Sequence, residues 1–331
     1  MNTGTCVYNG TPLNPSSTTG DRPTLEHIIP LSMGGCDAFA INDVSEKANS
    51  RAGSEIDGAL ANDPLVSMQR QTHLLTGHSG TVPAVNLELS PLGGRGQRGR
   101  LTFSADKEPE IAFPPSIQGS LQESADTGMP MMIESHMPGA RKVLQSVLHK
   151  AESKGLSLRT LDKKPIDSVE DAIAASSSVT YDTVHSVIHG GLMLHRLERF
   201  ALKASLAYAH MAFGAVFTGG IDAQRLRDHL WEPTLRWSAA GIRGFAGVGN
   251  FSLAATLGLA PTKHFISIQV IESDLDTPVP SLVAFGSLFG VGPLQWALEL
   301  SSSPALVQLA RKRDVLTILD AKKKCVEITT L

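Results

Sequence analysis

A short β-branched run, then a proline and a double glycine, and then a helical apolar stripe constrain the N-terminal part of this chain most strongly. Residues Thr24–Ile29 favour a strand, Pro30 stops it, and Gly34-Gly35 indicates a turn. A stripe at i+4 spacing follows, formed by Val44, Ala48, Ala52, Ile56 and Leu60. The spacing predicts a helix over Asn42–Ala61, with Asp43 and Glu46 as a capping box and Asn62-Asp63-Pro64 at its end.

The rest of the chain divides by composition. Residues 65–139 are rich in glycine and proline, and predict an irregular connector with short strands at Val85–Leu89, Arg100–Ser104 and Ile111–Phe113. Residues 140–331 predict helices and then mainly strands: helices at Arg141–Lys154, Leu192–Ala212 and Ala223–Arg236, an extended segment at Val179–Ile188, and strands at His264–Ile271, Leu282–Phe289, Leu294–Leu300, Val315–Leu319 and Val326–Thr330. We therefore expect an α+β chain, with an N-terminal module over residues 1–64 and a mixed α/β domain over 140–331.

Composition sets broader limits. The 331 residues are 42% hydrophobic and 18% charged with a net charge of −3, so a nucleic-acid partner has to be argued from local charge. Three scattered cysteines and an N-terminus with no basic or apolar run predict a cytoplasmic protein with no signal peptide. Residues 277–298 carry no charge, but their prolines and glycines favour two buried strands joined at Gly-Val-Gly-Pro over a membrane span.

The dipeptide Glu26-His27 at the end of the predicted strand is the candidate catalytic site. Hydrolysis of a phosphodiester needs a base that activates water, together with a cation and the ligands that hold it beside the phosphate. An imidazole beside a carboxylate provides both kinds of group, and a helix packed across the strand provides a further oxygen ligand. A core histidine and an exposed glutamate are the alternative readings of the same two residues.

At this point the sequence resembles the HNH endonucleases. The residues that carry the resemblance are Glu26-His27-Ile28-Ile29-Pro30 with Gly34-Gly35, followed at the family's spacing by Asn42-x-Val44 and by Asn49-x-x-x-Gly53-x-x-Ile56-Asp57. The resemblance covers roughly the first 65 residues and implies a ββα-metal module that cleaves DNA. It implies His27 as the general base, Glu26 and Asn49 as ligands of Mg²⁺ or Mn²⁺, and Asn42 as the residue that orients the histidine.

The cysteines depart from the family pattern. Many relatives bind a structural zinc through two CxxC pairs, whereas this chain has Cys6-Val7-Tyr8-Asn9 at the first pair and Ser45 and Ala48 at the second. Serine and alanine do not replace thiolates on zinc, so we expect no structural zinc and stabilisation of the module by packing instead.

Five basic residues are candidates for contact with DNA phosphates. Lys47 and Arg51 flank Asn49, although a solvated helix face explains them equally well. Arg95, Arg98 and Arg100 alternate with glycines in a cationic tract that suits a phosphate backbone or, alternatively, is only a flexible loop. The leading expectation is a metal-dependent DNA endonuclease with no membrane association. The alternatives are an HNH-like module that binds nucleic acid without cutting it, and a nuclease directed at RNA.

Overall fold

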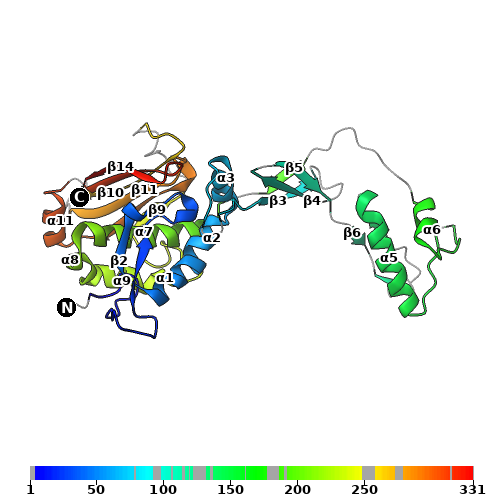
Figure 1. Cartoon of the computed structure of the whole chain (residues 1–331), viewed down its shortest axis with the longest axis horizontal. Helices are drawn as coiled ribbons and strands as arrows, with labels where there is room; N and C mark the ends of the chain where they lie inside the picture. The colour runs from blue at the N-terminus through cyan, green and yellow to red at the C-terminus, as the bar shows by residue number, and fades with distance from the viewer. Residues whose placement is uncertain are drawn as a thin grey trace. The chain divides into compact units, whose positions relative to one another are not determined.

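The chain folds as two compact units. The computed structural model describes residues 4–77, 80–91, 98–105, 107–113, 116–118, 120–121, 132–134, 137–160, 162–176, 186–189, 192–247, 258–272, 279–313 and 315–330 (Figure 1). Unit 1 comprises Met1–Val85 and Gly191–Leu331, and unit 2 comprises Asn86–Gly190. This division differs from the expected boundaries after residues 64 and 139, because the C-terminal segment packs onto the N-terminal residues.

Unit 1 is built on a six-stranded antiparallel sheet with the strand order β14-β13-β10-β11-β12-β9. Its strands are β9 Gly244–Ala246, β10 Lys263–Ile271, β11 Ser281–Ser287, β12 Gln295–Ser301, β13 Val315–Asp320 and β14 Cys325–Thr330. The five C-terminal strands predicted from sequence are confirmed. The uncharged stretch forms β11 and β12, and no helix in the described part of the chain is long and apolar enough to cross a membrane.

Helix α7 (Leu194–Phe213) is the central element of unit 1. It contacts β9, β11 and β12 along the sheet, and it also contacts the helical segments of the N-terminal module (Figure 1). Most of its residues are buried, and one continuous hydrophobic core includes residues of the sheet, of α7 and of the module. The shorter helices of this half are α8 Ala215–Thr218, α9 Ile221–Leu230 and α11 Pro304–Ala310. The helix expected to reach Arg236 ends at Leu230.

The N-terminal module consists of an antiparallel strand pair followed by helices. Its elements are β1 Pro23–His27, β2 Ala40–Ser45, α1 Glu46–Ala52, a π-helical turn Gly53–Asp57, α2 Gly58–Ala61 and α3 Pro64–Thr72. The helix predicted from Asn42 begins only at Glu46, because residues 40–45 pair with β1. The predicted capping box is wrong: Ser45 is the N-cap, and its hydroxyl accepts a hydrogen bond from the Ala48 amide at 3.3 Å.

Gly34 and Gly35 each allow a close backbone contact, one with the residue that follows β13 and one within the N-terminal module. Gly34 has a φ of 93°, and a Cβ built on it would lie 2.6 Å from the backbone of Ala321, next to β13. A Cβ on Gly35 would lie 1.7 Å from the carbonyl oxygen of Ile29. Both positions therefore require glycine, one for its conformation and close approach and the other for close approach alone. By contrast, a Cβ on Gly53 would meet nothing within 4 Å.

Unit 2 contains a four-stranded sheet, a strand pair and two helices among its described residues. The sheet has the order β5-β4-β3-β8, from β3 Val85–Pro91, β4 Gly99–Ser104, β5 Lys107–Ala112 and β8 Ser186–His189. The remaining elements are β6 Ser116–Gln118, β7 Met132–Glu134, α5 Met137–Ser153 and α6 Val169–Ala174. Arg98 and Arg100 are exposed here, whereas Arg95 lies outside the described residues.

The contrast between Gly34 and Gly53 yields a prediction for stability. Gly34→Ala should lower the free energy of unfolding by more than about 2 kcal/mol. The alanine would have to adopt a left-handed backbone conformation, and its methyl group would overlap with Ala321. Gly53→Ala should raise it by about 0.5–1 kcal/mol, because alanine is the better helix former. Urea unfolding of both variants checks this, and equal effects would show that Ala321 does not fix the turn.

Candidate functional site

His27 stands at the end of β1 and is paired with an aspartate. Its Nε2 lies 2.8 Å from Oδ1 of Asp37, which begins the short 3-10 turn Asp37–Phe39. The imidazole is 17% exposed, whereas the Asp37 side chain is 80% exposed. A neutral imidazole that donates its Nε2–H to Asp37 carries its lone pair on Nδ1, which is the atom then able to accept a proton. In the described part of the chain, no protein group hydrogen-bonds to that nitrogen.

Glu26 points away from His27 into a buried cluster of charges. Lys203 of α7 forms an ion pair with Glu26, lies 2.9 Å from Oδ2 of Asp57, and donates a hydrogen bond of 3.1 Å to the carbonyl oxygen of His27. The hydroxyl of Tyr8 donates to the same Glu26 oxygen at 3.0 Å. Lys203 and Tyr8 have no exposed surface, and Glu26 is 4% exposed. Alternation along a strand sends consecutive side chains to opposite faces, which explains why Glu26 and His27 separate.

Burial and pairing oppose each other in this cluster. Burial raises the pKa of Asp57 to about 6, although Lys203 acts in the other direction. Burial also lowers the pKa of Lys203, but the carboxylates of Asp57 and Glu26 outweigh it, so that its pKa is raised. Burial, and then the Glu26 carboxylate, raises the pKa of Tyr8 well above its ordinary value. Tyr8 therefore remains a hydrogen-bond donor, and Lys203 remains a cation.

Asn49 fastens helix α1 to the strand that carries His27. Its Nδ2 donates to the carbonyl oxygen of Leu25 at 2.8 Å and to Oγ1 of Thr24 at 3.0 Å. Asparagine is a poor helix former, and this double contact gives a physical reason for it in a helix. The side-chain oxygen is not used in the clasp.

The other sequence candidates occupy separate positions. Asn42 is exposed on β2, and Asp37 rather than Asn42 is the partner of the His27 imidazole. Lys47 is exposed on α1. Arg51 hydrogen-bonds to Glu55 at 2.9 Å, and its guanidinium lies 4.4 Å from the centre of the Trp231 ring. Arg51 is thus already engaged within the protein.

Apolar packing surrounds Cys6, the first of the cysteine positions considered for zinc. Cys6 is fully buried, and its sulfur accepts a hydrogen bond of 3.3 Å from the amide of Ser45. Ser45 and Ala48 are also buried against the core. Among the described residues, no group of three or more histidine, cysteine, aspartate or glutamate side chains could hold a metal ion. The expected lack of a structural zinc remains a prediction.

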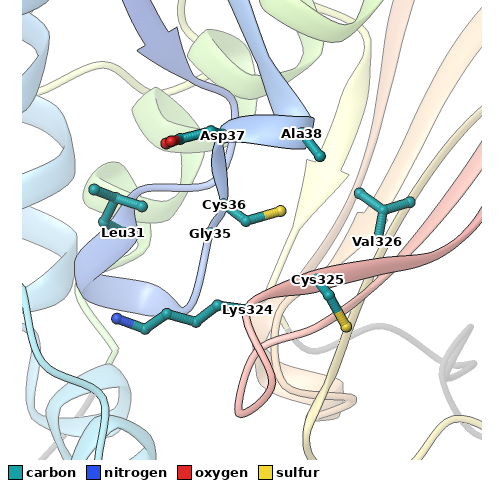
Figure 2. Close-up of a pocket in the computed structure, with 8 residues that line it drawn as sticks. All are labelled: Leu31, Gly35, Cys36, Asp37, Ala38, Lys324, Cys325 and Val326. Carbon is teal, nitrogen blue, oxygen red and sulfur yellow. The ribbon is translucent and has the colours of Figure 1, made fainter.

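A pocket of about 520 Å³ adjoins Asp37. Figure 2 shows its lining, which the 3-10 turn region and the β13–β14 turn provide: Leu31, Gly35, Cys36, Asp37, Ala38, Lys324, Cys325 and Val326. Cys36 points into the space between the two segments in this view, and Lys324 extends along its rim. The pocket therefore shares a wall with the His27–Asp37 pair.

Sequence reasoning missed four of these residues. Lys203 is the one charged residue of the buried run Phe200–Ala209, and a lysine on an otherwise apolar helix face is a visible signal of a buried partner. Asp57 is the last residue of the segment that resembles the HNH endonucleases, and the sequence alone assigns it no partner. Tyr8 and Asp37 carried no local signal, because their partners are set by tertiary packing. In comparisons with protein-family models, curated proteins and solved structures, nothing matches this chain.

The buried cluster predicts a large effect of removing its cation. Lys203→Met should lower the free energy of unfolding by about 3–5 kcal/mol, because two buried carboxylates lose their partner. Lys263→Met is the matched control, since Lys263 also joins two carboxylates but is 17% exposed. The triple variant Lys203→Met, Glu26→Gln, Asp57→Asn should recover much of the loss. Equal destabilisation by the two single variants would contradict this assignment.

Asp57 predicts a pH dependence. A folded-state pKa of about 6 means that the folded protein binds a proton more tightly than the unfolded chain does. The contribution of Asp57 to stability is therefore present below its unfolded pKa of about 4, and is lost as pH rises through 6, by roughly 3 kcal/mol in all. Urea unfolding between pH 4 and 7 should show that Asp57→Asn lacks this component. Parallel pH profiles for wild type and variant would contradict it.

Proposed function

We propose that unit 1 is an HNH-type endonuclease module that hydrolyses phosphodiester bonds in DNA. The observation that carries the proposal is the exposed pairing of His27 with Asp37 at 2.8 Å, at the end of a strand clasped to a helix by Asn49. The order of the strand, the double glycine and the helix supports it, as does the resemblance of residues 26–57 to that family. The nuclease has His27 as its general base.

The residues of the chain contribute base and positioning. His27 takes the proton of the attacking water on Nδ1, while Asp37 accepts the Nε2–H and stabilises the resulting imidazolium. Because Asp37 is 80% exposed, solvent screens this pair, and its main contribution is to fix the tautomer and the ring orientation. Nζ of Lys203 donates a hydrogen bond to the main-chain carbonyl oxygen of His27, and Nδ2 of Asn49 donates one to the carbonyl oxygen of Leu25 on the same strand.

We propose that a magnesium ion is held by Asp37 and by the substrate phosphate rather than by Glu26. Magnesium is often bound through one or two carboxylates together with substrate phosphates, and keeps several waters. The carboxylate of Glu26 is bound by Lys203 and Tyr8, so that an ion there would have to displace an ammonium group. The side-chain oxygen of Asn49 is a further donor in the proposal. When bound, the ion supplies stabilisation of the charge that develops on the phosphate.

One observation favours a second function. The engagement of Glu26 by a lysine leaves the module with fewer free oxygen donors than the family resemblance implies. A module of this kind that binds nucleic acid without cutting it is therefore the alternative. An RNA substrate is the remaining alternative. Cleavage assays with DNA and with RNA at matched salt concentration distinguish an RNA-directed nuclease from a DNA-directed one.

The proposal predicts the behaviour of His27→Ala. With Mg²⁺ or Mn²⁺, wild type should nick plasmid DNA and EDTA should stop the reaction, whereas His27→Ala should cleave at least about 10²-fold more slowly. DNA affinity should be nearly unchanged. His210→Ala is the matched control. His210 forms a similar pair with Asp43 at 2.9 Å in the same unit, and at 14% exposed it is buried to about the same degree as His27.

Three outcomes separate the candidates. Equal losses in the two histidine variants would show that a structural effect, and not a missing base, slows the reaction. DNA binding without metal-dependent cleavage by wild type would establish the binding module. Faster cleavage of RNA than of DNA would change the substrate class while keeping His27 as the base.

A further inference from the structure

The turn between β13 and β14 concentrates positive charge beside the candidate site. We call residues Ala321–Lys324 the lysine turn; it contains Lys322, Lys323 and Lys324 in succession. The carboxylates of Asp320 and Glu327 flank the turn, and both are paired with Lys263; a third carboxylate, that of Asp37, lines the same pocket as Lys324. Lys323 also forms ion pairs with Asp320 at 3.8 Å and with Glu327 at 3.6 Å, while its side chain remains 68% exposed. The four lysines thus exceed the three carboxylates, and Lys322 and Lys323 are exposed.

Contacts with the N-terminal module hold the lysine turn in place. Ala321 packs on Gly34, and Nζ of Lys324 donates to the carbonyl oxygen of Thr76 at 3.1 Å. The amide of Lys323 donates to Oδ1 of Asp320 at 2.9 Å. Lys322 is exposed and makes no ion pair within the described part of the chain. The positive charges are therefore presented from a fixed backbone.

The pocket connects this turn with the His27–Asp37 pair. Lys324 and Val326 line it on one side, and Asp37 and Ala38 line it on the other (Figure 2). Apart from Asp37 and Lys324, its lining is apolar or contributed by thiols and glycine. Lys324, beside a lining that is otherwise mainly apolar, suits a chain that alternates phosphates with sugars and bases.

We propose that the lysine turn binds the phosphate backbone of the DNA strand next to the bond that is cleaved, and that the pocket receives a sugar or base of that strand. The inference rests on the proposed function, because the shared wall with Asp37 is what selects a polynucleotide over another polyanion. Asp37 is the one carboxylate among the residues that line the pocket. The turn lies more than 250 residues after His27 in the sequence and lacks a recognisable motif.

The test measures binding in a background that does not depend on cleavage. The full chain with His27→Ala binds a fluorescein-labelled 20-base-pair DNA duplex, and anisotropy gives the affinity at several salt concentrations. Adding Lys322→Gln and Lys323→Gln should flatten the slope of log affinity against log salt by about 1–2, since each lost phosphate contact removes about 0.9. Adding Arg311→Gln and Lys312→Gln instead is the matched control.

The control pair has the same charge and a comparable setting. Arg311 is paired with Glu272, and Lys312 is exposed and makes no ion pair in the part of the chain that is described. Both precede β13, whereas the lysine turn follows it, so they lie at opposite ends of that strand. Their removal should leave the slope unchanged. A third variant, Ala38→Trp, fills the pocket and should weaken binding at every salt concentration without altering the slope.

The outcomes are separable. Equal slopes for the lysine-turn variant and the control variant would overturn the inference, and so would polyglutamate that competes as well as an equal charge of DNA. Plasmid cleavage by wild type is measured in parallel. If wild type cleaves plasmid and the salt slope of the lysine-turn variant is unchanged, the proposed function is supported and the lysine turn is not a DNA-binding surface. A flattened slope without cleavage keeps the lysine turn as a DNA-binding surface and removes the nuclease.

Discussion

The ammonium group of Lys203 is the contact on which unit 1 depends. It comes from α7, in the segment after unit 2, and reaches Glu26, Asp57 and the carbonyl of His27 in the N-terminal module. Burying three charges costs several kcal/mol per ion before pairing is counted. The two ion pairs and the hydrogen bond from Lys203 to the carbonyl oxygen of His27 join α7 to the end of β1 and to the π-helical turn.

The role of Glu26 follows from the same contact. The family resemblance places Glu26 and His27 together as ligand and base, yet a strand presents consecutive residues to opposite faces. In this chain the inner face receives the carboxylate and the outer face receives the imidazole. The chemical partner of His27 is then supplied by Asp37 from the following turn. The dipeptide thus combines a buried residue that joins the charged cluster and a residue that is proposed to be the base.

Local patterns in the sequence predict much of the fold and only part of the site. The strands at the C-terminus and helices α5 and α7 were predictable, because their apolar periodicity is strong and agrees with the packing. The start of α1 was not, since the apolar stripe at helical spacing begins at Val44, which pairs with Thr24 of β1 instead. The chain division was also hidden, because residues before 86 and after 190 meet only in three dimensions. His27 was singled out by its motif, whereas Asp37, Tyr8 and the lysine turn have significance only through their neighbours.

The net charge of −3 illustrates the same limit for electrostatics. Charges at the surface are screened over about 8 Å at physiological salt, so a polyanion responds to the few groups nearest to it and hardly to the total. The lysine turn carries three consecutive lysines, while the neighbouring acids are paired with Lys263. An overall acidic chain therefore presents a cationic edge beside the His27–Asp37 pair. Gly34 allows Ala321, at the start of that edge, to approach the module closely, since a Cβ on Gly34 would lie 2.6 Å from the Ala321 backbone. The glycine that looks like a simple turn residue in the sequence is thus what places the basic surface next to the proposed base.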